Sequence, residues 1–360
     1  MDTNTGLLHF GEPGNKPDNI KHSSGESIIK ELTGIMELND FPMFSRRIRE
    51  IGRSFSAMKD TYLKGGSDGF DVSGINQDID QILEAFTLEC SKYYLRRLIR
   101  GLTSTREGKL NNMNLNRWKE YSNIITDSLW ILERRDRNGA HNAGYWGNFV
   151  PQIPNQLLNR FTKKGEWVPD VFLGGGTTII ESRRLGRNSI GIDLSPEVVK
   201  LASENISKEG DPFNVRAEII NADSTTLDYH EVLRRIGTQS VQLVIMHPPY
   251  WDIVKFSENE SDLANAASLE GFRNGIRTCM EKIYKILDGG RYFALVVGDK
   301  YSKGEWIPPG LYAMNEALKI GYRLKSVVVK NFDVTKGKKR QAELWRYRTP
   351  VGGFYVFKGE

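Results

Sequence analysis

The sequence predicts an α/β fold, an open and mostly parallel sheet with helices on both faces, preceded by an all-helical N-terminal domain. After residue 141, short β-type runs alternate with helical stretches, the order that gives a parallel sheet covered by helices. Residues 27–135 instead carry apolar residues at helical spacing and no strand pattern. We therefore expect a flexible lead-in over 1–26, a helical domain over 27–140 and an α/β domain over 141–360.

The helical half is predicted from apolar residues three and four positions apart. A first helix begins near Ser27. A second has its apolar positions from Ile75 to Tyr94 and ends in a basic last turn at Arg100, with Gly101 as its C-terminal signal. A polar, Asn-rich link then leads to a third predicted helix over 118–132. No strand is expected in this half.

In the second half, β-type runs alternate with patterned helices such as 196–208 and 272–287. The last two runs are separated only by a loop, so they should pair antiparallel at one edge of the sheet. The predicted strands are 167–173, 189–194, 217–221, 241–246, 291–297, 324–329 and 354–357.

Composition excludes several classes of protein. No run approaches the roughly 18–20 apolar residues that span a membrane, and the N-terminus has no secretory pattern. Two cysteines and five scattered histidines do not form a disulfide framework or a zinc site, so we expect a cytoplasmic protein without a metal. The net charge of +5 permits a polyanionic partner without requiring one.

A glycine-rich loop follows the first predicted strand, in the run VPDVFLGGGTTII over 168–180. Glycines at this place let the backbone approach a ligand, and Thr177 or Thr178 can cap the next helix. No lysine follows the last glycine, so this is not a phosphate loop of the Lys-bearing type. By itself the loop is as readily a tight turn as a binding site.

Acidic residues end the next two strands. Asp193 closes the run IGIDL, where a carboxylate can accept hydrogen bonds from ribose hydroxyls. Asp223 follows the third strand, where it can meet an adenine amino group. Either aspartate alone is as readily a helix cap, but together with the glycine loop they favour a nucleoside cofactor.

The fourth strand ends in an unusual tetrad, His247-Pro248-Pro249-Tyr250, within LVIMHPPYW. Successive prolines fix an extended backbone whose carbonyls remain free to accept hydrogen bonds. The side chain of residue 247 and the Pro248 carbonyl can hold the two N–H groups of an exocyclic amino group. Tyr250 can then stack on a base flipped out of a duplex. This arrangement suits the transfer of a methyl group to an amino nitrogen.

In these motifs and their order, residues 141–360 resemble the S-adenosylmethionine-dependent DNA amino-methyltransferases, which act on adenine N6 or cytosine N4. Their cofactor motif is typically Asp-Pro-Phe-x-Gly-Ser-Gly-Thr-Thr, and their catalytic motif is Asp, Asn or Ser followed by Pro-Pro-Tyr. The stretch 145–154 resembles the segment that packs around the methionine end of the cofactor, and 298–310 resembles a stretch after the fifth strand. In register with the cofactor motifs stand Asn148, Phe149, Asp170, Phe172, Gly174, Gly176 and Thr177.

The resemblance implies a Rossmann-like seven-stranded methyltransferase sheet, whose last strand is either shortened here or cut off. It also implies S-adenosyl-L-methionine as cofactor, double-stranded DNA as substrate, and a homodimer or a restriction or defence partner. Val171 and Gly175 replace the usual Pro and Ser, and His247 replaces Asp, Asn or Ser. Because only a neutral imidazole accepts a hydrogen bond, we expect activity to fall on acidification near the ordinary histidine pKa of about 6.5.

DNA contacts should come from loops and from the helical half, because too few residues follow Tyr250 for a separate recognition domain. The basic run KGKKR is our candidate for phosphate contacts. Its cationic residues are Lys336, Lys338, Lys339 and Arg340. Two alternatives stay open, namely an RNA methyltransferase on the same fold and a catalytically weakened DNA-binding subunit.

Overall fold

The computed structural model divides into two compact units. The first, the helical unit, comprises Met1–Arg106 and Asn114–Tyr121, and the second, the sheet unit, comprises Glu107–Met113 and Ser122–Glu360. The division lies earlier than the boundary expected near residue 140, because 122–140 contain a strand that joins the sheet. The structure describes residues 25–57, 72–104, 107–121, 123–132, 134–141, 144–145, 147–302, 305–331 and 352–358.

Helices pack around one apolar core in the helical unit. Leu32, Phe44, Ile48 and Leu95 are fully buried at its centre. Its elements within the described residues are α1 (Gly25–Ile35), α2 (Phe41–Ala57), α3 (Val72–Leu83), α4 (Leu88–Thr103) and the 3-10 helix η1 (Leu115–Glu120).

Two helices that the sequence predicted in this region differ from those in the structure. The single helix expected from Ile75 to Arg100 is two helices, because Thr87 starts α4 by accepting the backbone N–H of Cys90 at 3.2 Å. Gly101 lies inside α4, not after it. The helix expected over 118–132 is η1 followed by strand β1 (Leu129–Ile131), whose partner β9 (Arg323–Asn331) is distant in the sequence. A short apolar run cannot reveal such a partner.

The sheet unit is built on a mixed sheet of eight strands among the described residues, in the order β1-β9-β10-β6-β5-β2-β3-β4. The central strands are parallel, while β10 is antiparallel to both β6 and β9. The bounds of the strands not yet given are β2 (Trp167–Asp170), β3 (Asn188–Asp193), β4 (Ala217–Asn221), β5 (Val241–Met246), β6 (Leu287–Gly298) and β10 (Gly352–Lys358). A separate hairpin joins β7 (Lys300–Ser302) to β8 (Glu305–Ile307).

The seven-stranded sheet expected from the sequence therefore requires correction. Strand β1 is the additional member, and it pairs in parallel with β9, from Leu129 opposite Val329 to Ile131 opposite Asn331. The last strand, β10, is present and pairs along its length with β6 and β9. The antiparallel pair of β9 and β10 is as predicted, but β1 lies outside it.

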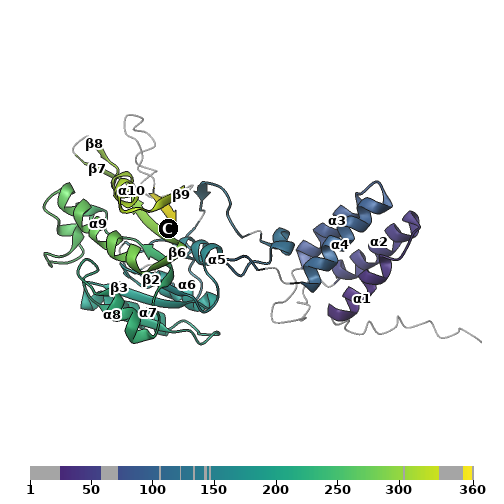
Figure 1. The fold of residues 1–360 in the computed structure, drawn as a ribbon, viewed down its shortest axis with the longest axis horizontal. Coiled ribbons are helices and arrows are strands. Elements are labelled where there is room, and N and C mark those ends of the chain that lie inside the picture. The colour runs from purple at the N-terminus through teal and green to yellow at the C-terminus, as the bar shows by residue number, and fades with distance from the viewer. Residues whose placement is uncertain are drawn as a thin grey trace, which may run out of the picture. The chain divides into compact units, whose positions relative to one another are not determined.

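Helices cover both faces of the sheet (Figure 1). One face carries α5 (Gln152–Phe161), α6 (Thr177–Leu185) and α7 (Pro196–Ser207). The other carries α8 (Tyr229–Ile236), α9 (Leu269–Ile286) and α10 (Pro309–Ile320). This arrangement is the one that alternating β and α runs predict.

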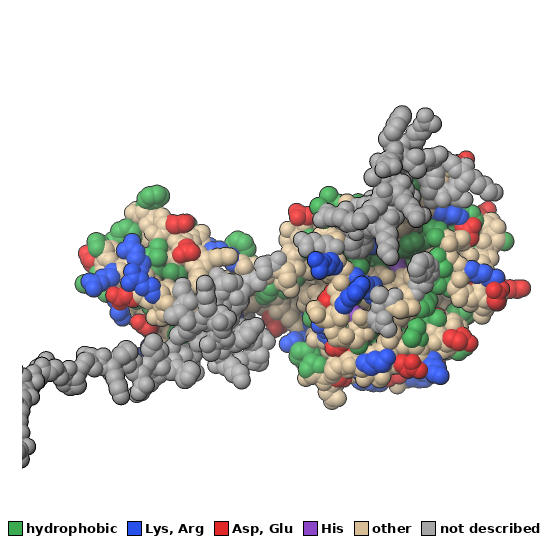
Figure 2. All heavy atoms as spheres, turned by 180° about the vertical axis from the view of Figure 1, so that it is seen from behind, with side chains coloured by type: hydrophobic (Ala, Val, Ile, Leu, Met, Phe, Trp, Pro, Cys, Tyr) green, Lys and Arg blue, Asp and Glu red, His purple; other side chains and the backbone are tan. Residues whose placement is uncertain are grey.

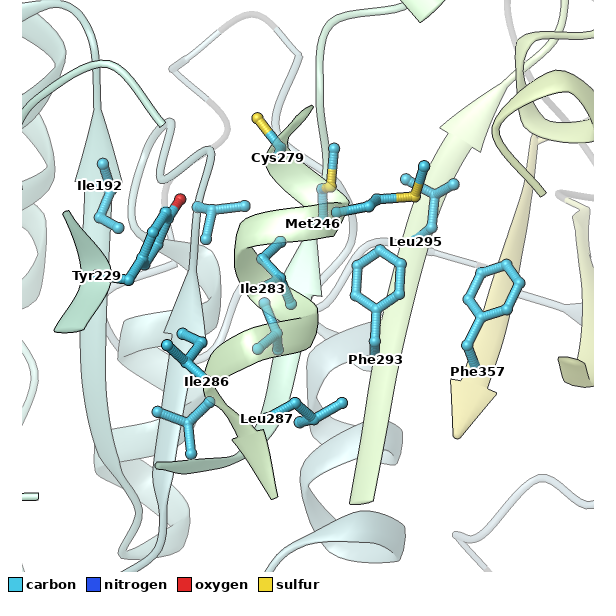
Figure 3. Packing of buried hydrophobic residues seen from close by; sticks show 14 of the residues in the cluster. Ile192, Tyr229, Met246, Cys279, Ile283, Ile286, Leu287, Phe293, Leu295 and Phe357 are labelled. Carbon is cyan, nitrogen blue, oxygen red and sulfur yellow. The ribbon is translucent and has the colours of Figure 1, made fainter. Parts of the chain in front are cut away.

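Side chains alternate between the two faces of the sheet along the central strands, and an apolar core forms on each face. On β6, Phe293 and Leu295 face α9, while Ala294 and Val296 face α5. Figure 3 shows Phe293 beside Phe357 of β10, whose rings stack at a centroid distance of 5.5 Å. This packing fixes the central strands, whose carboxyl ends carry the residues of the candidate site.

Candidate active site

A cavity of about 450 Å³ opens at the carboxyl ends of β2, β3, β4 and β5. Its size lies within the range of small-molecule sites, and this end of an open α/β sheet is where ligands bind. A hollow lined with hydrophobic side chains opens on the face of the sheet unit shown in Figure 2. The sequence-predicted residues that line the cavity are Asn148, Phe149, Phe172, Gly174, Asp193, Asp223, His247, Pro248, Pro249 and Tyr250.

Three predicted cofactor residues do not line the cavity. Asp170 ends β2 and is completely buried, and Gly176 and Thr177 form the start of α6 behind the loop. Burial raises the pKa of Asp170 to about 7, although its Oδ1 accepts the N–H of Phe172 at 3.1 Å. The three residues stand at the two ends of the loop, where β2 ends and α6 begins. The predicted DNA contacts Lys336, Lys338, Lys339 and Arg340 lie outside the described residues.

The glycine loop is shaped by its neighbours. Gly176 adopts φ +86°, in the left-handed region, as it leads into α6. The N–H of Gly175 donates to Oδ1 of Asn148 at 3.0 Å. A Cβ atom at Gly175 would lie 2.4 Å from Nδ2 of Asn148, so the serine usual in the resembled motif would displace the Asn148 side chain. The glycine at this position is thus matched to Asn148.

Asp193 ends β3 and connects the loop to the next helix. Its Oδ2 accepts the N–H of Gly174 and its Oδ1 accepts the N–H of Ser195, each at 3.0 Å. Burial raises the pKa of Asp193, and these two hydrogen bonds act in the opposite direction. Each oxygen keeps a further lone pair that can accept a ribose hydroxyl from the cavity.

His247 and Tyr250 of the tetrad contact each other. The Nε2 atom of His247 lies 2.8 Å from the Tyr250 hydroxyl, and the imidazole ring lies 4.7 Å from the ring of Phe149. Burial lowers the pKa of His247 to about 3, and the nearby positive charge of Lys330 adds to the shift. Burial also raises the pKa of Tyr250, so the hydroxyl keeps its proton.

The low pKa of His247 moves the expected acid limb from the ordinary histidine value near 6.5 to a much lower pH. The expectation assumed an ordinary imidazole, and the amino-acid sequence does not reveal how deeply a side chain is buried. The neutral imidazole that accepts a hydrogen bond is the form present throughout the usual pH range.

Tyr250 packs against the end of β6. A Cβ atom at Gly298 would lie 2.6 Å from the Tyr250 ring, so only glycine leaves room for the ring at this place. Gly298 opens the stretch 298–310 whose resemblance to related enzymes was noted from the sequence. The start of that stretch therefore lies against the Tyr250 ring.

The cavity also contains residues that the sequence reasoning missed. The post-tetrad loop, residues 251–268, contributes Phe256, Ser257 and Asp262 to its lining. Tyr145, from the segment before α5, stacks on Phe256 with a centroid distance of 6.3 Å. The loop is irregular, apart from two short 3-10 helices, η2 (Trp251–Ile253) and η3 (Leu263–Asn265), so no periodicity could have indicated it.

Charge is unevenly distributed in the cavity lining. Asp193, Asp223 and Asp262 are acidic, and among the described lining residues there is no lysine or arginine. Over the same part of the chain, no group of His, Cys, Asp and Glu is arranged to hold a metal ion. Nor is any helix in it long and apolar enough to cross a membrane.

Comparison with known proteins points to DNA methylases. Residues 75–204 match the family model described as DNA methylase, N6_N4_Mtase. A type II methyltransferase of Bacillus subtilis, M.BglI, is 30% identical over 88 residues, which cover 24% of this chain and 24% of the relative. Another from Methanocaldococcus jannaschii, M.MjaII, is 39% identical over 82 residues, covering 22% of this chain and 15% of the relative.

Other matches cover more of this chain. A putative ribosomal RNA large subunit methyltransferase of M. jannaschii is 30% identical over 130 residues, 35% of this chain and 30% of that protein. Among solved structures, TrmN from Thermus thermophilus is 17% identical, with a TM-score of 0.39, and the match covers 59% of this chain and 49% of that one. The chain thus matches less than a third of the length of these sequence relatives. The family match over residues 75–204 and the type II relatives confirm the resemblance to the N6/N4 DNA amino-methyltransferases that the motifs predicted.

Proposed function

We propose that this protein transfers a methyl group from S-adenosylmethionine to an exocyclic amino group, cytosine N4 or adenine N6, of a base flipped out of double-stranded DNA. The observation that carries the proposal is the single cavity lined by the tetrad, the glycine loop and the strand-end aspartates. These motifs come from separate places in the sequence. The glycine loop and the aspartates would bind the methyl donor, and the tetrad would hold the methyl acceptor.

The described residues fit this cofactor. Its ribose hydroxyls would donate to Asp193, and its adenine amino group to Asp223. The bare backbone at Gly174 and Gly175, held by Asp193 and Asn148, allows the close approach that the cofactor needs. When bound, S-adenosylmethionine supplies an electrophilic methyl group.

The tetrad would hold the target base. Phe149 and Tyr250 offer aromatic faces to a flipped base. The neutral imidazole of His247 accepts one N–H of the target amino group, taking the place of the Tyr250 hydroxyl at Nε2, and the Pro248 carbonyl accepts the other. Gripped in this way, the amino nitrogen can present its lone pair to the methyl group. The nitrogen then loses one proton, for which the imidazole is an acceptor.

A covalent route through cysteine is not supported. Ring-carbon methylation requires a thiolate nucleophile beside the base. Neither Cys90 nor Cys279 is among the residues described as lining the cavity, and Cys90 belongs to the helical unit. Burial raises the pKa of Cys279 to about 12, which disfavours a thiolate. Direct transfer to an amino nitrogen is the chemistry that the site favours.

Incubation of the purified chain with isotopically labelled cofactor tests the proposal. Parallel samples would contain mixed-sequence duplex DNA, transfer RNA or ribosomal RNA, and digestion to nucleosides would identify the methylated base. We expect N4-methylcytosine or N6-methyladenine in DNA alone. His247→Ala should abolish most of the incorporation, whereas His230→Ala, an exposed histidine on α8, should not.

Incorporation into RNA alone would overturn the DNA assignment and favour the RNA alternative, which the ribosomal RNA methyltransferase relative represents. Cofactor binding without incorporation into any nucleic acid would favour the weakened-subunit alternative. A homodimer or a restriction or defence partner, a cytoplasmic location and phosphate contacts by the KGKKR run remain proposals beside this one.

A further inference from the structure

Asp262 reaches the cavity from the post-tetrad loop and belongs to none of the motifs identified in the sequence. It lines the same cavity as Asp193 and Tyr145. Burial is the main cause of the raised pKa values of Asp193 and Tyr145, and the negative charge of Asp262 raises both further. Asp262 therefore shares the cavity with Asp193 and Tyr145 and is near enough for its charge to act on both.

The carboxylate is fixed in place by its own loop. Its Oδ1 accepts the N–H of Ala264 at 2.9 Å, and its Oδ2 accepts the Ser257 hydroxyl at 2.7 Å. The side chain of Asn265 donates to the carbonyl oxygens of Ser257 at 2.9 Å and Asn259 at 2.8 Å, which closes the loop on itself. A carboxylate held in this way is pre-oriented before any ligand arrives.

The loop in turn is anchored over the cavity. Trp251 donates its indole N–H to the carbonyl of Ala266 at 2.9 Å, and the Lys300 ammonium lies 4.2 Å from its ring centroid. At the other side, Phe256 stacks on Tyr145. Both contacts keep the segment that carries Asp262 against the site.

No positive charge among the described lining residues neutralises this carboxylate. Asp262 also has no ion pair with another described residue. The tetrad adds no carboxylate, because His247 stands where the resembled motif has Asp, Asn or Ser, and it is neutral. A ligand that carries positive charge would balance the negative charge of the cavity.

We propose that Asp262 is a cofactor-binding residue whose carboxylate faces the cationic part of S-adenosylmethionine, its sulfonium and α-ammonium groups. This inference rests on the proposed function, because it assumes the same cofactor in the same cavity. The sulfonium loses its charge when the methyl group leaves, so the product, S-adenosylhomocysteine, carries one positive charge fewer. Asp262 then holds the substrate form of the cofactor more tightly than the product form and favours its exchange.

Titration calorimetry of the full chain, without DNA, tests this role. Asp262→Asn removes the charge while its amide can still pair with Ser257 and Ala264. We expect the Kd for S-adenosylmethionine to rise about tenfold, and that for S-adenosylhomocysteine by a smaller factor of about threefold. Glu260→Gln is the matched control, since it removes one charge from the same loop at an exposed position outside the cavity.

The proposal fails if Asp262→Asn binds S-adenosylmethionine as tightly as wild type, or if Glu260→Gln weakens binding equally. It also fails if Asp262→Asn weakens both ligands by the same factor. Asp262→Ser provides a second removal of the charge, and the ligand-free melting temperature shows whether each variant is folded. A wild-type chain that binds neither ligand would instead refute the proposed function, which keeps the two failures distinct.

Discussion

Replacing His247 by asparagine should change how stability depends on pH. The imidazole is partly buried against Phe149 and Tyr250, and its pKa in the folded chain is about 3. Asparagine occupies this position in relatives of the resembled motif, and it does not titrate. Comparing the two proteins therefore isolates the proton that His247 takes up when the chain unfolds.

The sign and size follow from proton linkage. Below pH 6.5 the unfolded imidazole binds a proton, while the folded one stays neutral until about pH 3. The unfolded state thus binds more protons across this window, and stability falls as the pH falls. Integrated between pH 7 and pH 5, the linkage gives a loss of about 2 kcal/mol that the His247→Asn variant should not show.

Urea unfolding of both proteins at pH 7, 6 and 5, followed by far-ultraviolet circular dichroism, measures this difference. Asp170 contributes with the opposite sign, because its pKa of about 7 in the folded state makes that state bind more protons as the pH falls. This contribution is common to both proteins and cancels. Parallel pH dependences for wild type and variant would refute the burial of a neutral imidazole in the tetrad.

Three further substitutions follow from the geometry of the site. Gly298→Ala should displace the ring of Tyr250 and lower methyl transfer about tenfold. Calorimetry should show a cofactor affinity within twofold of wild type. Unaltered methyl transfer would mean that the position of the ring does not matter. Gly175→Ser should lower the free energy of unfolding by about 1–3 kcal/mol through its clash with Asn148, and adding Asn148→Ala should restore it. A double variant no more stable than the single one would contradict that account. Asp193→Ala should weaken cofactor binding about tenfold or more, as the ribose loses a hydrogen bond to a charged group, and an unchanged Kd in a folded variant would exclude the ribose assignment.

The spacing of apolar residues and the residues at strand ends were enough to predict most of the sheet unit. Short apolar runs located the central strands, because these strands are buried on both faces and most of their residues are apolar. The order of these runs placed Asp193 and His247 at one edge of the sheet, and the structure brings both to one cavity. Residues that end parallel strands share an edge, so the pattern determines their proximity.

Long-range contacts and burial could not be predicted in this way. Strand β1 is a short run whose strand character depends on β9, and local spacing favoured a helix there. The pKa of His247 depends on what surrounds the ring, and Asp262 reaches the cavity only through hydrogen bonds within an irregular loop. None of these features leaves a repeat in the sequence.

The position of β10 has a consequence for the order in which this chain folds. Among the described strands, β9 pairs with the rest of the sheet only through β10, and β1 only through β9. Leu129 and its partner Val329 are about 200 residues apart. Neither strand can dock until residues 352–358 have been synthesised and inserted beside β6. Closing so large a loop is slow, so this edge should be the last part of the unit to form and the first to open. Deleting residues 352–358 should release three strands from the sheet rather than one, leaving the unpaired edge of β6 exposed to aggregation.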